Sequence, residues 1–288
     1  FSHYLSSDVI NEIILNPDKL SLGGEKRQMT ALFTDVKGFS SISETMDPTE
    51  LVKLLNTYLT EMSNILLSQK GTIDKYEGDA IISFFGAPLD LEDHAVRACA
   101  SAVRMKKAEA ILNEHIMTNK VSPAPLRTRI GINTGEMVVG NMGTAEKMDY
   151  TIMGNSVNLA ARLEGVNKQY NSWKLMSEYT YHAGGNQFVT RKLDRVRVVG
   201  IQQPVRLYEL IDEKEFASEE ELERIRQFHA SLELFEEKRW DEALEGFKKL
   251  SDENPDDGPV NTYIRRSLEY RKKAPPENWD GIFNLSMK

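Results

Sequence analysis

Up to about residue 211, short runs of apolar residues alternate along the chain with longer segments whose apolar residues recur at helical spacing. Short extended runs predict strands, and longer runs with apolar residues three and four positions apart predict helices. The predicted strands are Met29–Val36, Thr72–Tyr76, Ala80–Phe85, Leu126–Asn133, Met137–Asn141, Tyr150–Met153, Val196–Val199 and Val205–Leu210. The predicted helices are Ser7–Leu15, Pro48–Leu67, Asp90–Asn113 and Gly154–Val166.

Turn-forming residues separate several of these elements. Glu77-Gly78-Asp79 lies between two strand-like runs and predicts a hairpin turn, and Thr134-Gly135-Glu136 predicts a second turn. The order strand, helix, two strands, helix, strand is typical of a ferredoxin-like α+β sandwich. We therefore expect an antiparallel-rich sheet with helices and an added layer.

The pattern changes after Asp212, where an acidic run precedes three helical segments. These segments are Leu222–Glu237, Trp240–Lys249 and Val260–Arg271. Trp240, Ala243, Phe247 and Pro255 match one tetratricopeptide-like helical hairpin. A single hairpin cannot bury its own apolar face, so we expect it to pack on the main domain or on a partner. The predicted parts are a helical linker (1–25), a domain (26–212) and a small helical extension (213–288).

Composition excludes several classes of function. The 288 residues carry a net charge of −8 without a basic block, which disfavours nucleic-acid binding. The single cysteine, Cys99, excludes an intramolecular disulfide and fits a reducing compartment. No apolar run is long enough to cross a bilayer. Because the chain begins at Phe1 and not at a methionine, we expect a soluble piece of a longer protein.

Two aspartates are candidates for metal binding. Asp35 ends a predicted buried strand just before Gly38, and Asp79 lies at the predicted hairpin tip. Taken singly, the first suits a helix cap and the second an ordinary turn. Taken together, carboxylates at neighbouring strand ends can hold two hard cations about 4 Å apart, as in phosphoryl transfer.

The segment Tyr150–Glu164 contains a second candidate group. Gly154 opens its predicted helix, and Asn158 and Arg162 lie four residues apart on one face. An amide beside a guanidinium can hold phosphate or ribose oxygens. The alternative is a surface arginine paired with an acidic neighbour.

Four segments together resemble the motifs of class III nucleotidyl cyclases in order and spacing. They are Phe33–Phe39, Lys75–Ala80, Arg129–Gly135 and Tyr150–Glu164, and the resemblance covers about Lys26–Leu210. It implies the cyclase catalytic fold and attack of a ribose 3′-hydroxyl on the α-phosphorus of a nucleoside triphosphate. It also implies a head-to-tail homodimer whose sites take metals from one chain and base, ribose and arginine contacts from the other.

The resemblance assigns a role to each matching residue. Asp35, Asp79 and the backbone carbonyl of Val36 match the ligands of two Mg²⁺ or Mn²⁺ ions. Asn158 matches the residue that orients the ribose, and Arg162 the residue that stabilises charge developing on the α-phosphate. Loss of such a charge-stabilising donor costs about 10²–10³ in rate.

Lys75 and Thr151 match the two positions that specify the purine. A lysine ammonium only donates hydrogen bonds, so it suits the acceptor N1 of adenine and opposes the N1–H of guanine. Thr151 can accept a hydrogen bond from the adenine 6-amino group. We therefore expect an adenylate cyclase. A threonine at this position resembles a bacterial and soluble-type subclass often stimulated by bicarbonate, which makes bicarbonate a candidate activator.

One departure from the family pattern keeps alternatives open. Val199 and Ile201 stand where members commonly have lysines, the second of which contacts the triphosphate. The alternatives are a higher KM for ATP, a substitute cation such as Arg195 or Arg197, or a weakened enzyme. The apolar Ile201 also supports a non-catalytic nucleotide-binding or dimerisation module. Guanylate cyclase is disfavoured by Lys75, and the diguanylate cyclase signature is absent. Both flanking segments resemble those of bacterial cyclases with an upstream sensor, so we expect the cytoplasmic output domain of a membrane-anchored parent.

Overall fold

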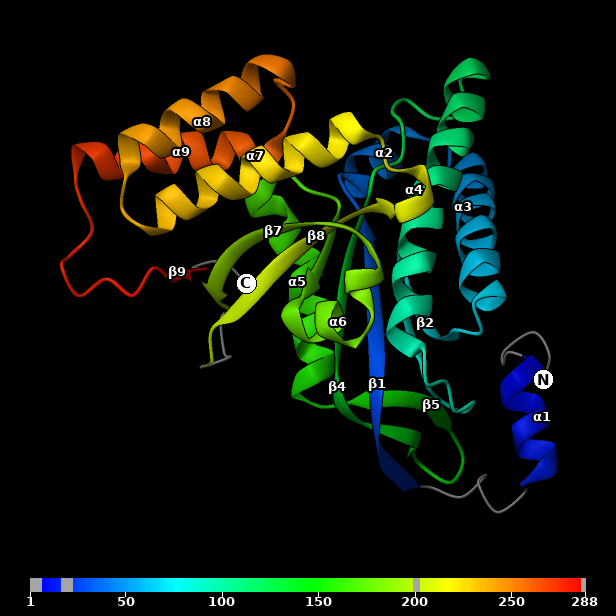
Figure 1. Cartoon of the computed structure of the whole chain (residues 1–288). Coiled ribbons are helices and arrows are strands. Elements are labelled where there is room, and N and C mark those ends of the chain that lie inside the picture. The colour runs from blue at the N-terminus through cyan, green and yellow to red at the C-terminus, as the bar shows by residue number, and fades with distance from the viewer. Residues whose placement is uncertain (1–6, 17–22, 199–202, 286–288) are drawn as a thin grey trace.

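The computed structural model describes residues 7–16, 23–198 and 203–285 (Figure 1). Its helices are α1 (Ser7–Leu15), α2 (Phe39–Thr45), α3 (Pro48–Ser68), α4 (His94–Thr118), α5 (Asn155–Tyr170), α6 (Glu178–Ala183), α7 (Glu219–Glu236), α8 (Trp240–Glu253) and α9 (Gly258–Lys272). Its strands are β1 (Gly23–Val36), β2 (Thr72–Glu77), β3 (Ala80–Phe85), β4 (Thr128–Gly143), β5 (Met148–Met153), β6 (Lys174–Ser177), β7 (Phe188–Arg197), β8 (Val205–Glu213) and β9 (Phe283–Asn284). No helix in these ranges is both long and apolar enough to span a membrane.

The strands described form a single sheet in the order β2-β3-β1-β4-β6-β8-β7-β9, with β5 paired to the far end of β4. Each neighbouring pair among the first four strands in this order is antiparallel, and α3 and α4 lie in the connections between them. This is the ferredoxin-like arrangement that the sequence predicts. After α5 the chain adds β6 parallel to β4, and β8 and β7 widen the sheet beyond it.

Alternate residues of β1 supply two cores, one on each face of the sheet. Leu32 packs in the cluster that contains Tyr58 of α3, whereas Ala31 packs in the cluster that contains Ala160 of α5. Helices α3 and α4 therefore cover one face and α5 covers the other (Figure 1). Because strand side chains alternate between faces, Asp35 follows Ala31 onto the α5 side.

The predicted turn Thr134-Gly135-Glu136 is wrong, because β4 runs through it without a break. Gly135 pairs with Met29 of β1 in an unshifted register. A Cβ atom at Gly135 would lie 2.4 Å from the Ser156 hydroxyl oxygen at the start of α5. The glycine thus permits close helix–strand packing and does not mark a reversal of the chain.

Some boundaries also differ from the predictions. Helix α4 begins at His94, four residues later than predicted, and β1 begins at Gly23, well before the apolar run. The short helix α2 was not predicted; its serines and threonine give little apolar periodicity, and Gly38 precedes it with a left-handed φ of 71°. Of the predicted strand Val196–Val199, the last residue lies outside the described residues, and β7 ends at Arg197.

The three helices after residue 213 pack on the sheet, as expected for a hairpin that cannot bury its own face. Phe228 and Phe247 share a buried cluster with Leu193 of β7 and Leu207 of β8. The rings of Phe228 and Phe247 lie 5.5 Å apart, centroid to centroid, in an edge-to-face contact. The extension and the sheet therefore have one continuous core in this region.

A buried ion pair joins α9 to β7 within that core. Arg266 donates to Asp194 Oδ2, and the Tyr170 hydroxyl of α5 donates to the same oxygen. Arg266 is 4% exposed and its guanidinium lies 3.7 Å from the centre of the Phe283 ring. Removing Arg266 would leave the Asp194 carboxylate buried without its counter-charge.

We expect Arg266→Leu to lower the free energy of unfolding by about 3–5 kcal/mol, the usual cost of breaking a buried ion pair from one side. Urea denaturation of the two proteins measures this difference. Arg271→Leu removes an exposed arginine from the same helix, paired with Asp241 at 3.5 Å, and should change stability by less than about 1 kcal/mol. Equal midpoints for Arg266→Leu and the wild type would show that the ion pair does not stabilise the fold.

Candidate active site

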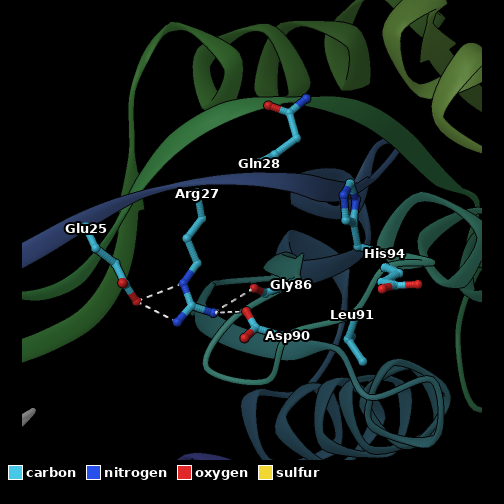
Figure 2. A pocket seen from close by; sticks show the side chains of 8 residues that line it. Glu25, Arg27, Gln28, Gly86, Asp90, Leu91 and His94 are labelled. Atoms are coloured by element: carbon cyan, nitrogen blue, oxygen red, sulfur yellow. Dashed lines mark hydrogen bonds and ion pairs between the residues drawn. The ribbon is translucent and has the colours of Figure 1, made fainter.

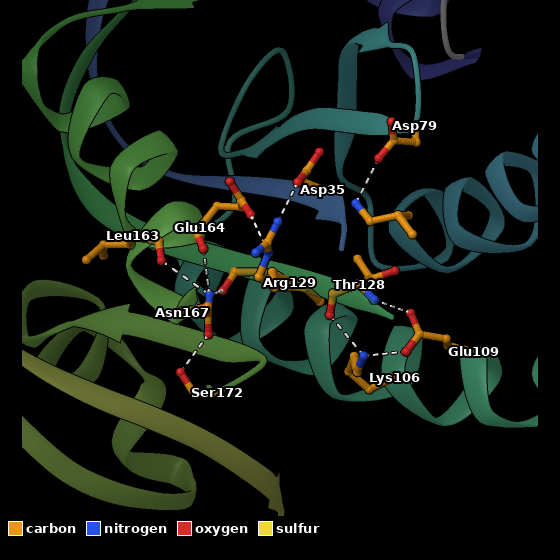
Figure 3. Close-up of polar contacts among 12 residues, drawn as sticks. Asp35, Asp79, Lys106, Glu109, Thr128, Arg129, Leu163, Glu164, Asn167 and Ser172 are labelled. Atoms are coloured by element: carbon orange, nitrogen blue, oxygen red, sulfur yellow. Dashed lines mark hydrogen bonds and ion pairs between the residues drawn. The ribbon is translucent and has the colours of Figure 1, made fainter. Parts of the chain in front are cut away.

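Asp35 and Asp79 come together where β1 ends beside the β2–β3 hairpin. Asp79 lies in the tight turn of that hairpin, after Gly78 with its left-handed φ of 63°. The backbone N–H of Val36 donates to Asp79 Oδ2 at 2.9 Å (Figure 3). Burial raises the pKa of the Asp79 carboxyl, and the nearby charge of Asp35 adds to the rise. The site therefore holds two carboxylates that repel each other.

These groups fit a hard divalent cation whose coordination shell also includes other ligands. The donor atoms are carboxylate oxygens, with the backbone of Val36 beside them, which suits Mg²⁺ or Mn²⁺ and not a soft metal. In the described parts of the chain, no cluster of three or more His, Cys, Asp or Glu side chains could hold a metal. Two carboxylates supply only part of an octahedral shell, so phosphate oxygens or water must supply the remainder.

Arg129 lies between Asp35 and Glu164, and neither Arg129 nor Glu164 is among the site residues predicted from the sequence. Arg129 Nη2 donates to Asp35 Oδ2 at 2.9 Å, and its Nε lies 3.2 Å from Glu164 Oε1 without hydrogen-bond geometry (Figure 3). Burial raises the pKa of Glu164 to about 7, and the charge of Asp35 contributes to this rise. Arg129 thus orients the carboxylate of Asp35. An arginine inside a buried strand is unusual enough to have identified it from the sequence.

The start of β4, which carries Arg129, is anchored to α4. Glu109 accepts a hydrogen bond from the backbone N–H of Thr128 at 2.7 Å. Lys106 pairs with Glu109 and donates to the carbonyl of Thr128 at 2.9 Å (Figure 3). This charge-assisted pair fixes the strand end next to the two aspartates.

Lys75 and Thr151 meet around a third residue, Asp74, which the sequence analysis did not single out. The Thr151 hydroxyl donates to Asp74 Oδ2 at 2.5 Å, although 77 residues separate them. Lys75 Nζ lies 3.7 Å from Asp74 Oδ1. Tyr150, the neighbour of Thr151, packs its ring against Phe84 and holds β5 over this part of the sheet. The fold therefore brings both predicted purine-specifying residues to one place within a single chain.

Asn158 and Arg162 lie on α5, which begins after Gly154 with a φ of 132°. Asn158 is exposed, and Arg162 is partly buried. Arg162 Nη1 is buried and has no hydrogen-bond partner among the described residues. Within those residues, no hydrogen bond or ion pair links Asn158 or Arg162 to Asp35 or Asp79. A buried guanidinium nitrogen without a partner is costly unless a ligand supplies an acceptor.

A further cavity in the described residues lies away from these side chains. It has a volume of about 510 Å³ and opens beside β1 and the segment before α4 (Figure 2). Arg27 in its wall is already bound by Glu25, Asp90 and the carbonyl of Gly86 (Figure 2). None of the predicted site residues lines this cavity, so its size does not identify it as the active site.

The departure from the family pattern at Val199 and Ile201 lies outside the described residues. Of the two arginines considered as substitutes, Arg197 is paired with Asp280 at 2.6 Å. Arg195 is exposed. Arg195 is therefore the better placed of the two to meet a ligand.

Comparison with known proteins gives a consistent result. The protein-family model described as the adenylate and guanylate cyclase catalytic domain matches residues 24–212. Adenylate cyclase 1 of Rhizobium meliloti is 31% identical over 212 residues, which are 73% of this chain and 31% of that protein. The chain spans 11%, 31% and 37% of the length of three curated relatives that it matches.

Two solved structures are similar to the chain to nearly the same degree. The adenylyl cyclase CyaB from P. aeruginosa has a TM-score of 0.63 and 36% identity, covering 68% of this chain and all of that one. The guanylyl cyclase Cya2 has a TM-score of 0.61 and 35% identity, covering 68% of this chain and 98% of that one. Overall similarity therefore does not distinguish ATP from GTP as the substrate.

Proposed function

The chain belongs to the class III nucleotidyl cyclases, and we propose that it converts ATP to 3′,5′-cyclic AMP and pyrophosphate at the interface of a homodimer. The observation that carries the choice of ATP is the meeting of Lys75 and Thr151 around Asp74. A lysine ammonium can only donate, which matches adenine N1 and opposes guanine N1–H. The neighbouring carboxylates of Asp35, which Arg129 binds, and Asp79 support the proposed chemistry.

In this proposal each group has one task. Asp35, Asp79 and the carbonyl of Val36 hold two divalent cations. When bound, these cations would lower the pKa of the ribose 3′-hydroxyl and neutralise charge on the triphosphate. Asn158 orients the ribose so that its 3′-oxygen is in line with the α-phosphorus and the departing pyrophosphate. Arg162 stabilises the charge that develops on the α-phosphate.

A twofold arrangement of two chains is proposed because, among the described residues, no hydrogen bond or ion pair links Asn158 or Arg162 to Asp35 or Asp79. Within the same residues, Arg162 Nη1 has no hydrogen-bond partner. In a head-to-tail homodimer, the metal-binding aspartates of one protomer face the arginine and purine contacts of its partner, twice over. A monomer would then be inactive.

Product formation from ATP and from GTP, each with Mg²⁺ and with Mn²⁺, tests the proposed function. We expect cyclic AMP from ATP, with kcat/KM for ATP exceeding that for GTP by roughly 10²-fold or more, because guanine places its N1–H against the ammonium of Lys75 where adenine offers an acceptor. Cyclic GTP product formed with equal efficiency would reject the assignment of ATP. ATP binding without pyrophosphate release, across a range of protein concentrations, would favour the non-catalytic module.

Two further predictions rest on the family resemblance alone. Bicarbonate is proposed as an activator because of Thr151, and titration at fixed pH against a chloride control would reject it if activity stayed flat. We also propose a cytoplasmic location within a longer, membrane-anchored parent whose sensor lies upstream. In such a parent, α1 is proposed to transmit the signal of the sensor by repositioning the two chains. Equal activity and dimerisation without residues 1–24 would argue against this role.

A further inference from the structure

Asp74 occupies an irregular position in β2. In the pairing of β2 with β3, Ile73 lies opposite Ser83 and Lys75 lies opposite Ile82, so Asp74 is an extra, bulged residue. A bulge redirects a side chain that regular alternation would point elsewhere. Here the redirected carboxylate accepts a hydrogen bond from the hydroxyl of Thr151 on β5.

The Asp74 carboxylate is buried and incompletely satisfied. Its side chain is 2% exposed, and Oδ1 has no hydrogen-bond partner among the described residues, with Lys75 Nζ 3.7 Å away. Burial raises the pKa of Asp74, while the hydroxyl of Thr151 and the charge of Lys75 oppose that rise. Since burying a carboxylate destabilises a fold, a purely structural role would be served better by an apolar residue.

We propose that Asp74 is a positioning residue that sets the purine preference by fixing the hydrogen-bond polarity of Thr151 and the position of Lys75. The inference rests on the proposed function, since it assumes that Thr151 and Lys75 contact the purine. Asp74 itself does not touch the nucleotide.

The physical basis is the single proton of a threonine hydroxyl. Alone, the hydroxyl of Thr151 can donate to the 6-oxo group of guanine or accept from the 6-amino group of adenine. A carboxylate only accepts, so the hydroxyl must give its proton to Asp74. Only lone pairs of Thr151 then remain for the purine, and these match adenine and repel guanine. The second carboxylate oxygen lies 3.7 Å from the ammonium of Lys75, and its charge attracts that ammonium toward the same edge of the base.

Asp74→Asn is the sharpest variant, because it keeps the shape and introduces an amide that can donate to Thr151. The measurement has two arms, with wild type and variant treated alike. One arm gives kcat/KM for ATP and for GTP. The other gives the Kd of 3′-deoxy-ATP and 3′-deoxy-GTP with Mn²⁺, which reports purine preference without turnover. We expect the preference for adenine to fall roughly tenfold or more in both arms.

Two controls separate positioning from general damage. Asp149→Asn removes a neighbouring exposed carboxylate of β5 and should leave the preference unchanged. In a Thr151→Val background, Asp74→Asn should cause little further change in preference, because the hydroxyl through which it acts is gone. Thermal unfolding of each variant checks that the fold is retained.

The outcomes distinguish this inference from the proposed function. An equal loss for both nucleotides in Asp74→Asn, with the preference intact, overturns the positioning role while leaving the cyclase activity in place. If neither the wild type nor Asp74→Asn forms cyclic product, but their binding preferences for the two analogues differ as expected, the positioning role is supported and the proposed activity is rejected. A wild type that binds both analogues equally overturns the inference directly.

Discussion

Asp79→Asn is expected to abolish cyclic AMP formation while leaving the fold intact. The variant keeps an oxygen that can accept the N–H of Val36, the hydrogen bond that holds the β2–β3 turn to the end of β1. It removes one of the two charges proposed to bind the cations. Loss of several kcal/mol of metal-dependent stabilisation corresponds to a fall of roughly 10³-fold or more in kcat, at about 1.36 kcal/mol per tenfold.

Metal binding can be checked without turnover. Mg²⁺ or Mn²⁺ should raise the Tm of the wild type, because a ligand that binds only the folded state stabilises it. The same additions should leave the Tm of Asp79→Asn nearly unchanged. Glu77→Gln removes an exposed carboxylate from the same hairpin and should behave as the wild type in both measurements. Wild-type activity in Asp79→Asn would exclude Asp79 as a ligand.

Arg162→Ala is expected to lower kcat by about 10²–10³, with a much smaller change in KM for ATP. The reason is that Arg162 is proposed to act on charge that appears only in the transition state. Its Nη1 is buried and has no hydrogen-bond partner within the described residues, so the variant breaks no hydrogen bond of that atom there. Steady-state kinetics at saturating metal measures both parameters.

The control for this variant lies on the same helix. Lys168→Ala removes an exposed cation from α5 and should retain wild-type kcat. Arg162→Lys keeps the charge but loses the planar fork of donors, and its kcat should fall between those of the wild type and Arg162→Ala. A change confined to KM would mean that Arg162 binds the ground state and transition state equally.

Local sequence signals predicted the elements on which the site depends. The turn at Gly78 and Asp79 was predicted correctly because its chemistry is local, with a glycine supplying the left-handed backbone. Helices α7, α8 and α9 were predicted because each has a clear apolar period. At Gly135 the local signal misled: the glycine serves contact with Ser156, a residue of another element, and not a turn.

The parts of the site that escaped the sequence analysis depend on contacts between distant segments. Arg129 contacts Asp35 on β1 and Glu164 on α5, and these contacts make it part of the site. Residue spacing along the chain does not predict such contacts between separate elements. Asp74 reaches Thr151 only because β2 bulges and β5 folds back over the sheet. Residue spacing predicts which side chains share a face of one element, but not which elements meet.

Mixing two inactive variants tests the central claim, a cyclase site divided between two protomers. In a heterodimer of Asp79→Asn and Arg162→Ala, one of the two sites receives an intact Asp79 from one chain and an intact Arg162 from the other. Random exchange of equal amounts should therefore restore about a quarter of wild-type cyclic AMP formation from ATP, far above either variant alone. A mixture no more active than the sum of its two components, after exchange of subunits is verified, would contradict a shared site.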